Sequence, residues 1–266
     1  MLWDTHMHCH FSGDSQSLPE DMIKASIKKG LDGICFTDHL DFDYQEEPGM
    51  FDLDVDSYYK KIMSLQEKYK SVLPINFGIE MGLQPHVVEK NNIITQKYPF
   101  DFVIGSSHVV HGIDPYFDKF YEGKSEDEAY LDYFESILEN ISTNADYDVY
   151  GHLDYVVRYG PHKNKYYSYE KYADIIDEIL RQLIRHGKGI EINTAGFKYG
   201  LNHPNPTEEI LHRYKELGGE IITIGADGHK PEHIAFDFDK VPDILKNAGF
   251  KYYTVFKERK PEFISL

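Results

Sequence analysis

The sequence predicts an α/β fold in which parallel strands and helices alternate and close into a barrel. Short apolar or β-branched runs alternate with longer helical patterns along the 266 residues, as in parallel strands joined by right-handed crossovers. Roughly seven or eight such units fit a closed β/α barrel better than two doubly wound halves. Polar donors follow the runs at the carboxyl ends of the predicted strands, which is where β/α barrels carry their active sites.

The predicted strands are runs rich in β-branched and aromatic residues. They cover residues 2–6, 33–37, 75–80, 102–105, 148–151, 189–193, 220–225 and 252–256. The first predicted helix begins near Pro19 and ends near Gly30, because proline suits a first helical turn and glycine a C-terminus. The other predicted helices cover roughly residues 55–69, 125–142, 168–186, 207–217 and 241–247. No repeat or flexible linker interrupts the chain, so we expect one domain over residues 1–266.

Composition narrows the function classes. The hydrophobic content of 41%, with 21 Tyr and 16 Phe, indicates a packed globular protein. The formal net charge of −17 offers no basic stripe, so we expect neither a nucleic-acid nor a membrane partner. Cys9 and Cys35 lack zinc-knuckle or thioredoxin spacing, which favours a reducing, cytoplasmic setting. We find neither a membrane-spanning apolar run nor the pattern of a signal peptide.

Potential metal ligands recur at the predicted strand ends. Asp4, His6 and His8 would project from one face of the first strand, because alternate side chains share a face. Further strand-end donors are His39, Glu80, His108, His152, Asn193, Asp227 and His229. Burying so many ionisable groups together is costly without a cation. Imidazoles and carboxylates suit Zn, Fe or Mn, and these donors exceed the needs of one zinc ion. The pattern therefore predicts two or three neighbouring metal ions.

These motifs together resemble the polymerase-and-histidinol-phosphatase (PHP) superfamily. The matching segments, in the family's order, are Asp4-Thr5-His6-Met7-His8, Thr37-Asp38-His39, Gly78-Ile79-Glu80, Gly105-Ser106-Ser107-His108, Gly151-His152 and Asp227-Gly228-His229. Within the superfamily, residues 151–159 and 191–198 resemble segments of L-histidinol-phosphate phosphatases. The resemblance implies a distorted (β/α)7 barrel of the PHP type that holds three divalent metal ions (Zn, Mn or Fe).

The resemblance also implies a ligand set for each ion. The first ion would be held by His6, His8, Glu80 and Asp227, the second by Glu80, His108 and His152, and the third by Asp14, His39 and His229. Glu80 would therefore bridge two ions. Asp14 departs from the family's pattern, because many relatives carry a histidine at its position.

Three further residues are candidates for contact with the substrate. By resemblance, Arg158 would clamp the phosphoryl group with both arms of its guanidinium, and Lys198 would add positive charge there. His203 is a candidate for protonating the leaving oxygen, only because of its place in the loop after the sixth barrel strand. Asp41 and Asp43, just past His39, are candidates for binding a cationic end of the substrate.

The resemblance implies hydrolysis of L-histidinol phosphate to L-histidinol and phosphate, a step of histidine biosynthesis, by attack of a metal-bound hydroxide on phosphorus. The partner would then be a small-molecule phosphomonoester. Another phosphomonoester, such as phosphotyrosine or a nucleotide, is the nearest alternative. A metal-dependent amidohydrolase also opens with two histidines at this spacing, but it usually needs a carbamylated lysine or another ligand where Glu80 stands. A non-catalytic metal-binding module is the third alternative. The sequence leaves the oligomeric state open.

Overall fold

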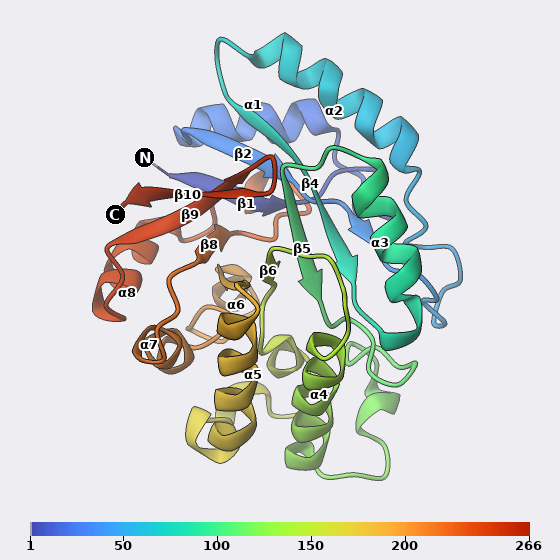
Figure 1. Ribbon diagram of the computed structural model, residues 1–266, viewed down its shortest axis with the longest axis vertical. Helices are drawn as coiled ribbons and strands as arrows, with labels where there is room; N and C mark the ends of the chain where they lie inside the picture. Colours follow the sequence, from blue (N-terminus) through green and yellow to red (C-terminus); the bar gives the residue numbers. More distant parts are fainter. Residues whose placement is uncertain (1) are drawn as a thin grey trace.

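The core of the computed structural model, which describes residues 2–266, is a parallel sheet curled into a barrel (Figure 1). Its strands follow the order β1 (Trp3–Met7), β2 (Gly33–Phe36), β4 (Ile75–Gly82), β5 (Phe102–Ser106), β6 (Val149–Tyr150), β7 (Gly189–Asn193) and β8 (Ile222–Gly225). The two-residue strand β3 (His39–Leu40) pairs with the second half of β4. All of these pairings are parallel, as the alternating pattern predicts.

The barrel closes between its first and last strands just where the donors lie. Met7 and Gly228 form an isolated parallel bridge. The His8 N–H donates to the carbonyl of Gly228 and the Asp227 N–H donates to the carbonyl of His6, each at 2.9 Å. The predicted distorted (β/α)7 barrel is therefore confirmed. Its closing seam, the contact between residues 6–8 and 227–228, brings the first and last predicted donors of the sequence side by side.

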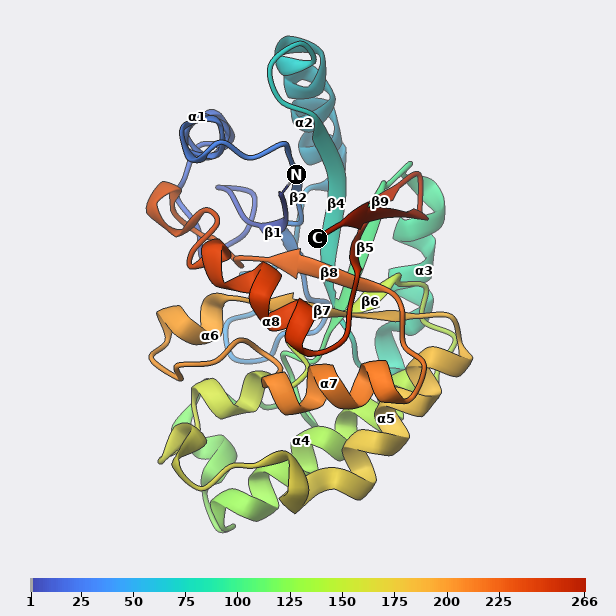
Figure 2. The ribbon, with the colours of Figure 1, turned by 90° about the vertical axis from the view of Figure 1, so that its left-hand side faces the viewer.

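Helices surround the barrel. They are α1 (Pro19–Lys29), α2 (Val55–Tyr69), α3 (Val88–Lys97), α4 (Glu126–Ile141), α5 (Ala173–Arg185), α6 (Ala195–Lys198), α7 (Glu208–Glu216) and α8 (Val241–Asn247). Helices α4, α5 and α7 gather on one side of the molecule, and α1 and α2 lie at the other end (Figures 1 and 2). Gly30 ends α1 in the left-handed region, with φ of 75°, as its position predicts. Within residues 2–266, no helix has both the length and the apolar character needed to cross a bilayer.

The structure corrects the sequence predictions at three places. The run at 252–256 belongs to β9 (Tyr252–Lys257), which pairs antiparallel with β10 (Lys260–Ser265) and is not a barrel strand. Helix α3 escaped prediction because its two buried residues, Asn91 and Thr95, are polar, so no apolar period marks it. Helix α5 begins at Ala173 rather than at 168, because a 3-10 turn precedes it.

The β9–β10 hairpin packs against the amino-terminal ends of barrel strands, opposite the donors. The ring of Phe256 stacks on Phe102, with centroids 5.2 Å apart. The carbonyl of Phe256 accepts a hydrogen bond of 2.7 Å from the Asn76 amide. Arg259, in the hairpin turn, pairs with Asp148 just before β6 at 2.6 Å. The hairpin therefore completes the core at the end of the barrel that carries no site.

This packing gives a prediction for stability. Phe256 is 4% exposed, so Phe256→Ala should lower the free energy of unfolding by about 3–5 kcal/mol, through lost burial and the cavity left behind. Phe263→Ala, on the same hairpin, is the matched control, because that ring is 52% exposed and its loss should cost within about 0.5 kcal/mol. Chemical denaturation followed by circular dichroism measures both. Equal losses would show that the hairpin contributes through its backbone alone.

Candidate active site

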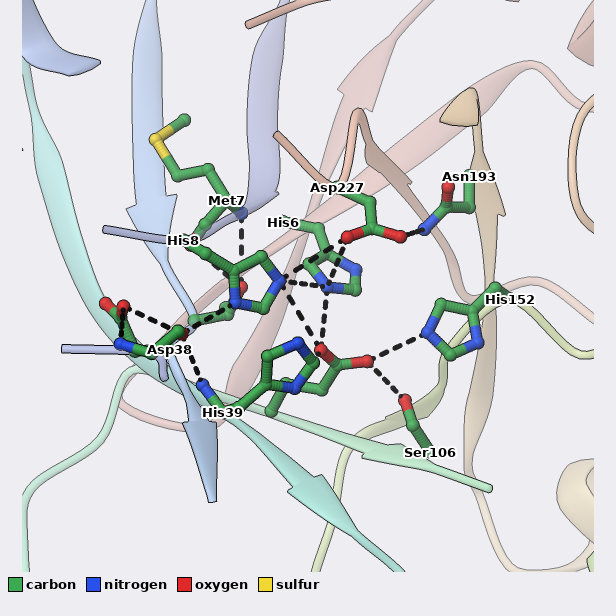
Figure 3. A network of polar contacts seen from close by, with 12 residues as sticks. His6, Met7, His8, Asp38, His39, Ser106, His152, Asn193 and Asp227 are labelled. Carbon is green, nitrogen blue, oxygen red and sulfur yellow. Dashed lines mark hydrogen bonds and ion pairs between the residues drawn. The ribbon is translucent and has the colours of Figure 1, made fainter. Parts of the chain in front are cut away.

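The Glu80 carboxylate, fully buried on β4, lies at the centre of the donor cluster. Its Oε2 is 3.1 Å from Nε2 of His6 and 3.1 Å from Nδ1 of His39. Its Oε1 is 2.9 Å from Nε2 of His152 and 3.2 Å from Nε2 of His108. Figure 3 shows the rings of His6 and His8 from the end of β1 converging with His39 of β3 and His152 from the loop after β6. The two oxygens of one carboxylate thus face two separate sets of imidazoles.

The remaining donors lie on the side of the cluster next to the closing seam. Asp227 places Oδ1 3.5 Å from Nε2 of His8. His229 places Nε2 2.9 Å from Oδ2 of Asp14, and His39 reaches the same oxygen at 3.8 Å. The His8 ring stacks on both the His39 and the His229 rings, with centroids 4.2 and 4.1 Å away. All nine donors predicted from the sequence therefore lie in one cluster, Asp14 included.

The geometry of these donors fits metal ions better than it fits a hydrogen-bonded network. Nδ1 of His39 and Nε2 of His229 are buried and make no hydrogen bond within residues 2–266. Carboxylate oxygens of Glu80 and Asp14 nevertheless lie 3.1 and 2.9 Å from these two nitrogens. Three groups bring their ligand atoms within 4.8 Å of one another, namely His6–His8–Glu80, His39–Glu80–His108 and His8–His39–His229. Other donors of the cluster do form hydrogen bonds with Glu80. The two nitrogens that face carboxylate oxygens without hydrogen-bond geometry are of the kind that ligates Zn, Mn or Fe.

Buried acceptors behind the imidazoles set the direction in which each ring points. The Nδ1 of His6 is 2.7 Å from Oε1 of Glu191, and the Nδ1 of His108 is 2.7 Å from Oδ1 of Asp41. Carboxylates that accept an N–H from one ring nitrogen leave the other nitrogen as a lone-pair donor. Sequence reasoning did not single out Glu191 as a site residue. The signal that could have found it is its place two residues before Asn193 on β7, because alternate residues of a strand share one face. Asp41 binds this imidazole, so its suggested role on the substrate is wrong.

Asp43, the other carboxylate suggested for a cationic substrate end, lies outside the cluster. Its side chain is 47% exposed and pairs with Nε2 of His86 at 2.7 Å. Asp4 also differs from expectation, because its carboxylate faces the backbone N–H groups of Ala226 and Ala235 instead of the imidazoles. Asp4 therefore holds the end of β8 against β1 and is a structural residue.

Charge within the cluster is strongly coupled. Burial alone would raise the pKa of Glu80, but His6, His108 and His39 hold it well below its usual range. Burial lowers the pKa of His8, and the neighbouring His229 and His39 lower it further. Burial would raise the pKa of Asp227, and His6 reverses that shift. Burial would lower the pKa of His6 and of His108, but carboxylates, Glu80 among them, raise both. The cluster therefore keeps Glu80 and Asp227 ionised by placing positive charge beside them, which is the role that metal ions would take.

Arg158 lies beside this cluster on a 3-10 turn and is 3% exposed. Its Nε, Nη1 and Nη2 donate to Asn205, Asp227 and Asn193 at 2.8, 2.9 and 2.9 Å, respectively. Burial lowers the pKa of its guanidinium, and Asp227 more than offsets that shift. Of five N–H donors, these bonds use three. The guanidinium is thus fixed in place by the same carboxylate that belongs to the donor cluster.

A cavity opens over the cluster. Its wall includes Asp14, His39, His108, His152, Arg158, Asp227 and His229, and beyond them Tyr44, Phe51, Asp114, Tyr155, Tyr159 and Tyr199. The aromatic part of this wall and Asp114 were not found from the sequence, because they come from loops without a periodic signal. Lys198 donates to the carbonyl of Asp227 at 3.0 Å, and His203 places Nδ1 2.6 Å from the carbonyl of Pro204. Neither Lys198 nor His203 is part of the cavity wall.

Comparisons with known proteins give the family of the chain. The profile of the PHP domain matches residues 4–195. The chain is 36% identical to the histidinol-phosphatase of Lactococcus lactis over 97% of its own length and 95% of the relative's. It is 35% identical to the "Probable histidinol-phosphatase" of Clostridium acetobutylicum over 98% of both chains.

The structure also superposes on a solved one. The crystal structure of histidinol phosphate phosphatase from Lactococcus lactis, complexed with zinc, L-histidinol and phosphate, gives a TM-score of 0.90 at 36% identity and covers 98% of each chain. The barrel, the donor cluster and the match of the domain profile thus agree: the chain belongs to the PHP domain family.

Proposed function

We propose that this protein is a metal-dependent phosphatase that hydrolyses L-histidinol phosphate to L-histidinol and inorganic phosphate. The observation that carries the proposal is the buried Glu80 carboxylate, with two sets of imidazoles facing its two oxygens beside an anchored arginine. Full-length similarity to histidinol-phosphatases supports the choice of substrate. We also propose that residues 1–266 act as one PHP domain in the cytoplasm, a location that the two free, buried cysteines suit.

We propose three divalent metal ions. The residues that would hold them are His6, His8, Glu80 and Asp227 for the first, Glu80, His108 and His152 for the second, and Asp14, His39 and His229 for the third. Such ions act as Lewis acids that lower the pKa of water and offset the charge of a phosphoryl group. Glu191 and Asp41 hold the His6 and His108 rings in the orientation that ligation needs.

The remaining chemistry belongs to the residues around the cluster. Arg158 presents its two remaining N–H donors to phosphoryl oxygens, and its bond to Asp227 keeps the fork from turning away. Lys198 adds positive charge beside Asp227. His203 is the candidate for protonating the departing oxygen, because its buried Nε2 makes no hydrogen bond within residues 2–266. Since Lys198 and His203 lie outside the cavity wall, each would act through a water molecule or a side-chain movement.

The bridging position of Glu80 predicts the outcome of removing it. Glu80→Ala should lose more than one equivalent of metal, because its Oε1 and Oε2 face different imidazoles and would bind different ions. Elemental analysis of the purified variant against the parent protein measures this. Asp43→Ala is the matched control, since that carboxylate is exposed and pairs with His86 away from the cluster. Loss of one equivalent or none from Glu80→Ala would contradict the bridge.

The Arg158 guanidinium is held by three hydrogen bonds, so we expect that a lysine at this position, although positively charged, does not restore kcat/KM. Arg158→Lys keeps a cation near Asp227 but loses the planar fork, so kcat/KM should fall roughly 10²-fold or more. Metal content, measured on the same sample, should remain that of the parent. Arg213→Lys is the control, because that arginine lies on α7 and pairs with Asp177 of α5, away from the cavity. Activity of Arg158→Lys within about threefold of the parent would remove the fork from the mechanism.

A phosphate-release panel tests the proposed function itself. The metal-loaded protein should turn over L-histidinol phosphate with kcat/KM at least about 10³-fold above that for a simple aryl phosphate. Equal turnover of phosphotyrosine or a nucleotide would leave a metal-dependent phosphatase with a different substrate. Hydrolysis of amides with no release of phosphate would favour an amidohydrolase, and no turnover at all would favour a metal-binding module.

A further inference from the structure

Asp154 is a buried carboxylate that belongs neither to the donor cluster nor to the cavity wall. It is 0% exposed and directly precedes the 3-10 turn Tyr155–Arg158. Its Oδ1 accepts from the Asn205 amide Nδ2 at 2.6 Å. Its Oδ2 accepts from the Thr207 N–H at 3.2 Å and from the Tyr167 hydroxyl at 3.4 Å. Burying a carboxylate costs free energy, so these partners indicate what Asp154 contributes.

The Asn205 side chain connects Asp154 to Arg158. Its amide donates through Nδ2 to Asp154 and accepts through Oδ1 from Nε of Arg158 at 2.8 Å. Asn205 is itself 0% exposed, and it exchanges two backbone hydrogen bonds with Asn193, each of 2.8 Å. The amide therefore lies fixed between an anion and a cation, with its dipole aligned to both. Hydrogen bonds in such a chain strengthen one another.

The charge of Asp154 decides which end of the Asn205 amide faces Arg158. A carboxylate only accepts hydrogen bonds, so it binds the NH2 group of the amide and turns the carbonyl oxygen toward Nε. If the amide flipped, its NH2 group would meet the Nε–H donor, and a buried donor would be left unpaired. An unpaired buried donor costs more free energy than a typical hydrogen bond contributes. The orientation of the amide therefore follows from the carboxylate behind it.

This orientation matters because three hydrogen bonds hold the Arg158 guanidinium. Asn205 accepts from Nε, while Asp227 and Asn193 accept from Nη1 and Nη2. Asp227 also belongs to the donor cluster, and the two asparagines do not. Recognition of a phosphoryl group by two parallel N–H bonds requires a planar fork of fixed direction. Loss of the Nε bond would let the guanidinium turn, so that its two remaining N–H donors no longer point at one place.

We propose that Asp154 is a positioning residue, which orients the Asn205 amide and thereby fixes the Arg158 guanidinium in the direction that binds a phosphoryl group. The inference rests on the proposed function and deepens it, because it states how the arginine is held from behind the cavity. Asp154 acts only through Asn205 and Arg158 and contacts no reacting group. Its effect is therefore the same for every phosphomonoester, since all of them share the phosphoryl group.

Inorganic phosphate, titrated into the metal-loaded protein in a calorimeter, tests the inference without turnover. In Asp154→Asn the new amide keeps its oxygen on the Thr207 N–H and turns its NH2 group toward Asn205, which must then flip. The dissociation constant for phosphate should rise about tenfold. Tyr167→Phe is the matched control, because it removes the other side-chain partner of Asp154 and leaves Asn205 in place. Its phosphate affinity should stay within about twofold of the parent's.

Exchanging the two side chains should restore the arrangement. In the double variant of Asp154→Asn with Asn205→Asp, the amide at position 154 donates to the carboxylate at position 205, whose other oxygen accepts from Nε of Arg158. Asn205→Asp alone sets two buried carboxylates against each other and should also weaken phosphate binding. The double variant should bind phosphate more tightly than either single variant. An affinity no better than that of Asp154→Asn would refute the inference.

A second comparison separates positioning from a purely structural role. In an Arg158→Lys background there is no planar fork to orient, so Asp154→Asn should lower phosphate affinity and kcat/KM no further. Thermal unfolding and metal content, measured on the same samples, show whether each variant is intact. If Asp154→Asn does not fold, Asn205→Asp in the parent and in the Arg158→Lys background gives the same comparison.

An equal loss of phosphate affinity in both backgrounds would show that Asp154 supports the fold alone, and would refute the inference while the proposed function stands. If the parent releases phosphate from no phosphomonoester, the proposed function is refuted. The phosphate affinities of the variants then still decide the role of Asp154, because they are measured without turnover.

Discussion

The structure depends on the burial of one carboxylate, Glu80, among imidazoles at the mouth of a barrel. A buried charge of this kind is stable only when opposite charges and hydrogen bonds surround it. The barrel supplies them by bringing β1, β3, β4 and the loops after β5 and β6 to one point, so that no single segment has to fold around the site. Glu191 and Asp41 then fix the His6 and His108 rings from behind. Every other feature of the site is arranged around this core.

Close packing between strands limits what these positions tolerate. A Cβ added at Gly225, at the end of β8, would lie 2.2 Å from Oε1 of Glu191 and 2.4 Å from the Cβ of His6. Glycine is therefore needed at this position so that β8 can approach the pair that orients the first imidazole. The opposite end of the barrel carries no donor cluster. There the β9–β10 hairpin packs Phe256 against Phe102, and its Arg259 pairs with Asp148. Stability and chemistry are thus separated to the two ends of the barrel.

The site combines two kinds of buried carboxylate. Glu80, Asp227 and Asp14 meet imidazole or guanidinium groups of the protein itself. Asp114, on the cavity wall, accepts hydrogen bonds from the Tyr44 hydroxyl and the Tyr116 N–H, and His108 opposes the rise in its pKa that burial causes. The net charge of −17 leads us to expect no polyanionic partner and is compatible with a small zwitterion.

The sequence by itself predicted the barrel and, at its strand ends, eight of the nine clustered donors; the ninth, Asp14, was implied by the family resemblance. Alternating apolar runs and helical patterns report local structure, and strand-end positions follow from them without knowledge of packing. Tertiary structure decided the rest, because it pairs residues far apart in the chain. Glu191 reaches His6 across 185 residues and Arg158 reaches Asp227 across 69. Packing also decided the role of Asp41, which accepts from the His108 ring instead of binding the substrate. No local period marks such contacts, since they exist only after the barrel closes and burial decides which charges meet.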